Sequence, residues 1–247
     1  VSMDLELNGK SALVWGGSKG MGYAAARRLA LEGADVVIAA RTEATLQDAA
    51  QALSRDCGRT VRYVVADITR NAGREAALAA CPQPDILVNN SDGYPPGDFR
   101  EWTQETWHEA LDMMMIGPID MIRRVVDGMQ ERRYGRIINI VSRSVKVAHA
   151  ELGLSNGARS GLVGFVAGLA RQTVRHNVTI NNVLPGAFDT DAQARHIDKL
   201  ARQTGKPADE VRRNREAGNP AGRFGRPDEV GALIAYLASA HTGYITG

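Results

Sequence analysis

The chain has 247 residues, of which 44% are hydrophobic, and a formal net charge of +2. This composition supplies a substantial core, and the small charge gives no strong attraction to nucleic acid or to an anionic membrane surface. No apolar stretch approaches the roughly 20 residues that a membrane-spanning helix needs. The first residues lack the segments of a secretory signal, and Cys57 and Cys81 form no CxxC pair. We therefore expect a cytoplasmic protein with reduced thiols and no metal, nucleic-acid or membrane partner.

The first predicted strand, residues 11–15, leads through a glycine-rich turn into a predicted helix over 20–32. Glycines let the backbone turn sharply and approach a pyrophosphate, and the N–H groups that begin a helix donate to it. The sequence therefore predicts a nucleotide phosphate site, formed by Gly16, Ser18, Lys19, Gly20, Met21 and Gly22.

Strands and helices alternate along the rest of the chain. Further strands are predicted near 34–40, 61–66, 85–89, 136–141 and 178–184, and helices near 43–56, 71–80, 104–132, 154–176 and 227–239. Such alternation is typical of a parallel sheet covered by helices on both faces. No repeat or linker divides the chain. We predict a single α/β domain over 1–247, a doubly wound Rossmann fold.

A polar segment at about 187–222, dense in both signs of charge, follows Pro185 and Gly186 at the end of the last predicted strand. Ligands of doubly wound sheets bind outside the carboxyl ends of the strands. We therefore expect this segment to form a small helical lid over a substrate. The alternative is a solvated helical pair without a ligand role.

The end of the second predicted strand indicates which cofactor binds. An NAD site usually places an acidic residue there, whereas this chain has Ala40 followed by Arg41. Lys19 and Ser18 of the glycine turn can reach the same point. Two cations without an anion suit a ribose 2′-phosphate, which predicts NADP(H). The alternative is that both cations only face solvent.

Further motifs follow the later strands in order: Asp67-Ile68, Asn89-Asn90, Ser142, Pro185-Gly186 and, near the end, Arg226-Pro227-Asp228-Glu229-Val230. On these motifs nearly the whole chain resembles the short-chain dehydrogenase/reductases, most of all the 3-oxoacyl-acyl-carrier-protein reductase-like branch. The resemblance implies that Asp67 lies near the adenine, Asn89 along the cofactor and Thr190 near the nicotinamide amide. It also implies cofactor contacts from Ile68, Pro185, Gly186 and Arg159.

The family's active site consists of an Asn, a Ser and a Tyr with a Lys four residues later. By register this chain has Met114 for the Asn, Ser155 for the Tyr and Arg159 for the Lys, and only Ser142 is in place. Trp15 stands where the family usually has Thr, and Ser91-Asp92 replaces Ala-Gly after the paired asparagines. These differences predict an atypical active site.

The missing phenol matters because hydride reduction of a carbonyl needs a proton for the developing alkoxide. Tyrosine starts near pKa ~10 and a close lysine lowers it, whereas a serine hydroxyl is a much weaker acid. Arg159 can hold the nicotinamide ribose but stays protonated. Losing a positioned general acid typically costs about 10²–10⁴-fold in rate.

Other residues are candidates for the missing group. Ser142 can hydrogen-bond a substrate carbonyl, and a desolvated Lys146 can act as acid or base. His149 and Tyr94, in predicted loops, can reach inward. The alternative for Lys146, His149 and Tyr94 is an ordinary surface role.

The predicted helix over 154–176 has two distinct faces. Ser155 and Arg159 share one face, and Gly157, Gly161, Gly164 and Gly168 share the opposite one. Such a glycine stripe suggests the close approach of another helix, either from the same chain or from a second copy. The resemblance implies a homodimer or homotetramer formed through the 104–132 and 154–176 helices.

The leading hypothesis is an NADP(H)-dependent oxidoreductase acting on a carbonyl or alcohol with an atypical active site. One alternative is a catalytically silent NADP(H)-binding protein. The other is a non-redox isomerase or lyase on the same fold. The identity of the substrate does not follow from the sequence.

Overall fold

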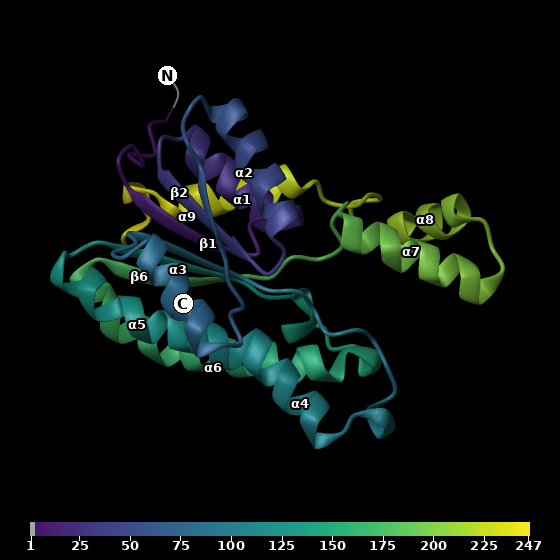
Figure 1. Cartoon of the computed structure of the whole chain (residues 1–247). Helices are drawn as coiled ribbons and strands as arrows, with labels where there is room; N and C mark the ends of the chain where they lie inside the picture. Colours follow the sequence, from purple (N-terminus) through teal and green to yellow (C-terminus); the bar gives the residue numbers. More distant parts are fainter. Residues whose placement is uncertain (1–2) are drawn as a thin grey trace.

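The computed structural model describes residues 3–247 and centres on a parallel sheet with strand order β3-β2-β1-β4-β5-β6 (Figure 1). This is the doubly wound Rossmann order, so the predicted fold class is confirmed. Val1 and Ser2, part of the N-terminal segment considered for a secretory signal, lie outside the described residues. The strands are β1 (Ser11–Trp15), β2 (Asp35–Ala40), β3 (Arg62–Val65), β4 (Ile86–Asn90), β5 (Gly135–Ile140) and β6 (Val178–Val183).

Helices cover both faces of the sheet because alternate strand residues are apolar in both directions. Val14 and Val88 face one core, while Leu13 and Leu87 face the other. The first core is covered by α1 (Gly20–Leu31), α2 (Glu43–Cys57) and α9 (Pro227–Ala238). The second is covered by α3 (Asn71–Ala80), α5 (Gly117–Glu131) and α6 (Gly153–Thr173) (Figure 1).

The predicted 104–132 helix is continuous in backbone direction but not in hydrogen bonding. It comprises α4 (Gln104–Leu111), a π-helical segment (Asp112–Ile116) and α5. Pro118 is the second residue of α5 and has no N–H to donate to the carbonyl one turn earlier, which favours the wider turn before it. The helix predicted over 104–132 is therefore present, with a π-helical segment inside it that includes Met114.

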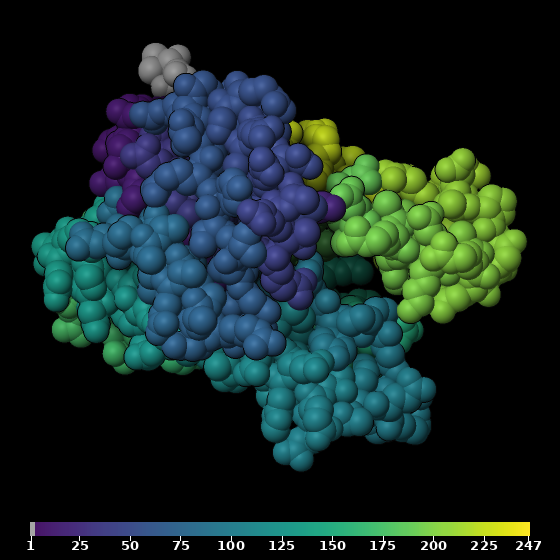
Figure 2. All heavy atoms as spheres, in the orientation of Figure 1, coloured from purple at the N-terminus to yellow at the C-terminus, as the bar shows by residue number. Residues whose placement is uncertain are grey.

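The segment after β6 forms two helices, α7 (Asp191–Thr204) and α8 (Ala208–Ala217). They stand apart from the sheet, and the space-filling view shows a hollow between them and the part of the chain that contains α4 (Figures 1 and 2). A small apolar cluster of Ile197, Val211 and Phe224 joins the pair. Arg212 of α8 also binds Asp189 with two hydrogen bonds of 3.1 and 2.7 Å. The helical part of the predicted lid is thus present.

Only half of the glycine stripe on α6 is covered by this chain. An added Cβ on Gly157 would meet the Trp107 ring at 3.0 Å, and one on Gly161 would collide with Met115. Gly164 and Gly168 have open space instead. The close approach predicted for this face therefore comes from the chain's own side chains at two positions. None of the helices in residues 3–247 is long and apolar enough to cross a membrane.

Candidate functional site

A cleft of about 410 Å³ lies at the carboxyl ends of the strands. Its floor is formed by Trp15 and Ala40, at the ends of β1 and β2. The structure brings together most of the residues predicted to bind the cofactor, since its lining includes Gly16, Ser18, Lys19, Gly20, Met21, Arg41, Asp67, Ile68, Arg159 and Thr190. The cleft is therefore the place where a dinucleotide would bind.

The glycine turn between β1 and α1 is built for close approach. Gly16 has φ +63°, which disfavours most side chains, and a Cβ on Gly22 would collide with the Gly16 carbonyl oxygen. That oxygen also accepts a hydrogen bond of 3.3 Å from the Asn90 side chain, which ties the turn to β4. Gly20 and Met21, the first residues of α1, line the cleft, and N–H groups at the start of a helix are available to an anion.

Arg41 and Asp92 face each other across the cleft. The Arg41 Nη2 lies 2.8 Å from the Asp92 Oδ2, and both side chains are largely exposed. Lys19 is exposed on the neighbouring turn. Asp92 stands where the resemblance expects a glycine. Its carboxylate therefore forms an ion pair with Arg41, one of the two cations predicted to bind the 2′-phosphate.

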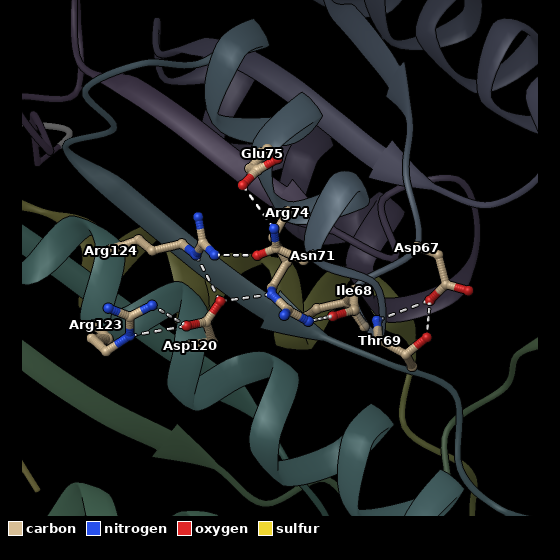
Figure 3. A network of polar contacts seen from close by, with 9 residues as sticks. All are labelled: Asp67, Ile68, Thr69, Asn71, Arg74, Glu75, Asp120, Arg123 and Arg124. Carbon is tan, nitrogen blue, oxygen red and sulfur yellow. Dashed lines mark hydrogen bonds and ion pairs between the residues drawn. The ribbon is translucent and has the colours of Figure 1, made fainter.

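The part of the cleft lined by Asp67 and Ile68 is connected to α5 by a polar network (Figure 3). Arg74 of α3 donates to the Ile68 carbonyl at 2.7 Å and pairs with Asp120 of α5 at 2.7 Å. Burial acts to raise the pKa of Asp120, but hydrogen bonds from Arg124 and Arg123 outweigh it and lower that pKa to about 2. The Asp120 carboxylate thus stays charged and holds Arg74 against the Ile68 loop.

Arg159 is deeply buried in the wall of the cleft, and each nitrogen of its guanidinium contacts this chain. Its Nε donates to the Ser155 hydroxyl at 3.2 Å, and its Nη1 donates to the Ile140 carbonyl at 3.1 Å. Its Nη2 lies 3.4 Å from the carbonyl oxygens of Ser91 and Asp92. Burial lowers the pKa of Arg159 to about 10, against the opposing charge of Asp92, so the guanidinium stays protonated at neutral pH.

Ser155, Ser142 and Lys146 lie outside the lining of the cleft. Ser155 is only 7% exposed and accepts the bond from Arg159. Ser142 is half-buried at the end of β5 and accepts from the Ser144 N–H at 3.1 Å. Lys146 is exposed in the following loop.

The remaining candidates are also separated from the cleft. His149 is exposed. The Tyr94 hydroxyl donates to Glu109 at 2.9 Å, and this hydrogen bond raises the pKa of the tyrosine. Met114 is buried among Ala110, Leu154 and Ala158 and has no polar function there. Within residues 3–247, no three metal-ligating side chains cluster together.

The sequence analysis selected Asn89 of the asparagine pair, but its neighbour Asn90 lines the cleft. Asn89 is 2% exposed inside the sheet and donates to Asn139 at 2.9 Å, and Asn139 in turn donates to Asn182 at 3.0 Å. The three lie side by side in register on β4, β5 and β6. Strand alternation, which puts neighbouring residues on opposite faces, was the signal that could have separated the two asparagines.

A second cavity of about 350 Å³ adjoins the cleft and shares Met21, Gly93, Thr190 and Ala192 with it. Gly186 and Thr190, both predicted to contact the cofactor, lie in its wall, whereas Gly22 and Pro185 line neither cavity. Gln193 and His196 of α7 line the second cavity as well. The sequence analysis missed these two, because a mixed-charge helix gives no sign of which face it turns inward.

The chain is similar to known proteins in both sequence and structure. The family model described as enoyl-(acyl carrier protein) reductase matches residues 16–247. The chain is 33% identical to a 3-oxoacyl-acyl-carrier-protein reductase of Vibrio cholerae, covering 98% of this chain and 95% of that protein. It is 31% identical to a D-beta-hydroxybutyrate dehydrogenase of Cupriavidus necator, with the same coverage of 98% and 95%. The structure of L-sorbose reductase from Gluconobacter frateurii, complexed with NADPH and L-sorbose, is similar with TM-score 0.94 and 26% identity, covering 99% of this chain and 95% of that one.

Proposed function

The chain belongs to the short-chain dehydrogenase/reductase family, and we propose that it is an NADP(H)-dependent oxidoreductase that interconverts a carbonyl compound and its alcohol. The observation that carries the proposal is the cleft itself, which joins a glycine cradle to Arg41 and Lys19 at one end and Arg159 at the other. The NADPH in the L-sorbose reductase complex supports the same cofactor.

The residues of the cleft fit a phosphorylated dinucleotide. Because a side chain at Gly22 would collide with the Gly16 carbonyl oxygen, glycine there lets the start of α1 pack closely against the turn, where its N–H groups would receive a pyrophosphate. Arg41 and Lys19 are the cations that would receive the 2′-phosphate. At the end of β2 the chain has Ala40 followed by Arg41, so no carboxylate is present there to bind the ribose hydroxyl as in an NAD site. When bound, NADPH supplies the hydride.

The other steps depend on this chain's own side chains. Arg159 would hold the nicotinamide ribose and supply positive charge near the developing alkoxide. Ser142 accepts a hydrogen bond from the Ser144 N–H, so its own O–H would be free to donate to the substrate oxygen. The Ser155 oxygen accepts a hydrogen bond from Arg159, and its hydroxyl is a weak acid, so we expect proton delivery to limit the rate.

One experiment separates the candidate functions. NADPH binding is followed by nucleotide fluorescence, and NADPH oxidation is measured over a panel of ketones, aldehydes and quinones. The proposal expects binding together with slow oxidation. Binding without oxidation on any substrate would instead identify a silent nucleotide-binding protein, and turnover that needs no nucleotide would identify a non-redox enzyme.

The silent protein is the second candidate because one specific contact favours it. The Arg159–Ser155 bond ties the two residues that replace the family's proton-donating pair to each other. A protein that only binds NADP(H) needs neither of them free.

We also propose a homodimer or homotetramer that uses the open part of α6. Gly164 and Gly168 have free space above them, and Phe165 between them is 41% exposed. A neighbouring copy would cover this apolar surface. Light scattering after chromatography tests the assembly, and Gly164→Glu should shift the protein toward the monomer.

A further inference from the structure

The second cavity carries an inference about the substrate, which rests on the proposed function. The cavity lies between α7 and the loops that follow β4 and β5, and opens into the cofactor cleft through Gly93 and Thr190. We infer that it binds an anionic carbonyl compound, whose carboxylate or phosphate is received by Gln193, His196 and Arg215 under the α7–α8 pair.

A buried hydrogen-bond donor without an acceptor belongs to a residue that lines this space. Gln193 and His196 lie three residues apart on α7, and residues at that spacing share one helix face. The Gln193 Nε2 is buried and has no hydrogen-bond partner in the described structure. Leaving a buried donor unsatisfied is costly, so its expected partner is an acceptor on a ligand.

Two arginines, Arg143 and Arg215, lie next to residues of the cavity wall without lining it themselves. Arg215 of α8 has a buried Nε without an acceptor. The Arg143 side chain lies over Gly186 in the cavity wall, with its Cδ 3.7 Å from the position of a Cβ on that glycine. Within residues 3–247, neither Arg143 nor Arg215 forms an ion pair. Other arginines of the chain do, among them Arg27, Arg74, Arg124, Arg212 and Arg223.

The cationic side chains near the cavity repel one another, and a bound anion would reduce this repulsion. Burial lowers the pKa of Arg215, and so does the nearby charge of Arg143. Burial also lowers the pKa of His196, with further lowering by Arg215 and Lys199 and only Glu151 opposing. One exposed carboxylate thus faces three cations, and a bound anion would offset their repulsion.

The apolar residues of the cavity wall indicate the size and polarity of the rest of the substrate. Pro96, Leu152 and Phe188 line the cavity with apolar surface. About 350 Å³ is near the lower end of the range for small-molecule sites. The substrate therefore has a compact apolar body, with its acidic group directed toward α7 and its carbonyl toward the cofactor cleft.

The test uses matched probes that differ in charge. NADPH oxidation is measured with 4-oxopentanoate against its methyl ester, and with dihydroxyacetone phosphate against dihydroxyacetone. We expect kcat/KM to be at least about tenfold higher for the anionic member of one pair, as one charge-assisted hydrogen bond would give. The pair that shows the preference separates a carboxylate from a phosphate. Equal or better use of both neutral members would overturn the inference and leave the proposed function standing.

Variants connect the preference to the cavity. Arg215→Leu should abolish it and Arg215→Lys should restore part of it, while Arg213→Leu, an exposed position on the same helix, should leave it unchanged. A preference that survives Arg215→Leu would contradict the inference. Calorimetric titration of 4-oxopentanoate and dihydroxyacetone phosphate into the NADP⁺-saturated protein gives a readout without turnover. Binding that Arg215→Leu weakens at least about tenfold, without NADPH oxidation, would support the inference and contradict the proposed function. No binding of either anion would overturn the inference.

Discussion

The Arg159 guanidinium donates through its Nε to the Ser155 hydroxyl at 3.2 Å, one helical turn away on α6. Its other nitrogens reach the carbonyls of Ile140, the last residue of β5, and of Ser91 and Asp92, which follow β4. Arg159 therefore fastens α6 to the carboxyl end of the sheet at the point where the family places its proton-donating pair. With Ser155 and Arg159 in place of the family's Tyr and Lys, the chain lacks the phenolic proton donor but keeps a positive charge at the cleft.

Restoring the family's residues should therefore restore proton transfer. In Ser155→Tyr with Arg159→Lys, we expect NADPH oxidation on responsive carbonyl substrates to rise at least about tenfold, because a positioned general acid is typically worth about 10²–10⁴. Steady-state kcat at saturating NADPH is the measurement. The single Ser155→Tyr variant is the control, since Arg159 would still occupy the new hydroxyl. Unchanged kcat in the double variant, with intact nucleotide binding, would count against a reductase-shaped site.

Arg41 should decide between the two nicotinamide cofactors. Arg41→Ala removes one of the two cations proposed for the 2′-phosphate, so the Kd for NADPH should rise about 10- to 100-fold while that for NADH changes little. Fluorescence titration with both nucleotides measures this. Arg55→Ala, an exposed arginine in the last turn of α2, is the matched control. Equal weakening of both nucleotides would contradict the assignment.

Asp92 should oppose cofactor binding. Its carboxylate pairs with Arg41 at 2.8 Å, and exposed ion pairs of this kind contribute up to about 1 kcal/mol. Asp92→Asn should therefore tighten NADPH binding by about two- to fivefold and leave NADH nearly unchanged. Asp98→Asn, at a surface pair with Arg100, should do nothing. Weaker NADPH binding in Asp92→Asn would show that the carboxylate assists the cofactor instead.

Asp120 makes the stability of the fold depend on pH in the acidic range. Its pKa is about 2 in the folded protein against 3.8 for the free side chain, so its contribution is complete above pH ~4 and is lost as the pH falls toward 2. Between these limits the free energy of unfolding should drop by about 2 kcal/mol on account of this group. Denaturant unfolding at a series of pH values should give a shallower decline for Asp120→Asn. Asp127→Asn, exposed on the same helix, should keep the original slope, and identical slopes for all three proteins would refute this role.

The fold was predictable because its signals are local and repeated. Apolar runs such as Val36–Ile38 require burial on both faces, and the glycines after Trp15 mark the first turn. The π-helical segment before Pro118 could not be read in the same way, because the proline also fits the first turn of an ordinary helix. The π-helical hydrogen bonds join residues five positions apart. Whether they form depends on the packing around Met114, which cannot be predicted from the sequence pattern.

The site was predictable where a motif fixes backbone and less so where side chains choose their partners. The glycine turn and Arg41 line the cleft as expected. The contact between Arg41 and Asp92 joins residues 51 positions apart, and no periodicity predicts it. Gln193 and His196 escaped notice because the position of α7 against the cleft is set by long-range contacts, among them the bond between Asp189 and Arg212.

A crystal structure of the protein with NADP⁺ tests the central claim most directly. We predict the 2′-phosphate within hydrogen-bond distance of Arg41 and Lys19, with Arg41 released from Asp92, and the nicotinamide ribose beside Arg159 with no tyrosine hydroxyl at the reactive carbon. A cleft that stays empty at saturating nucleotide, or a tyrosine hydroxyl placed against that carbon, would contradict it.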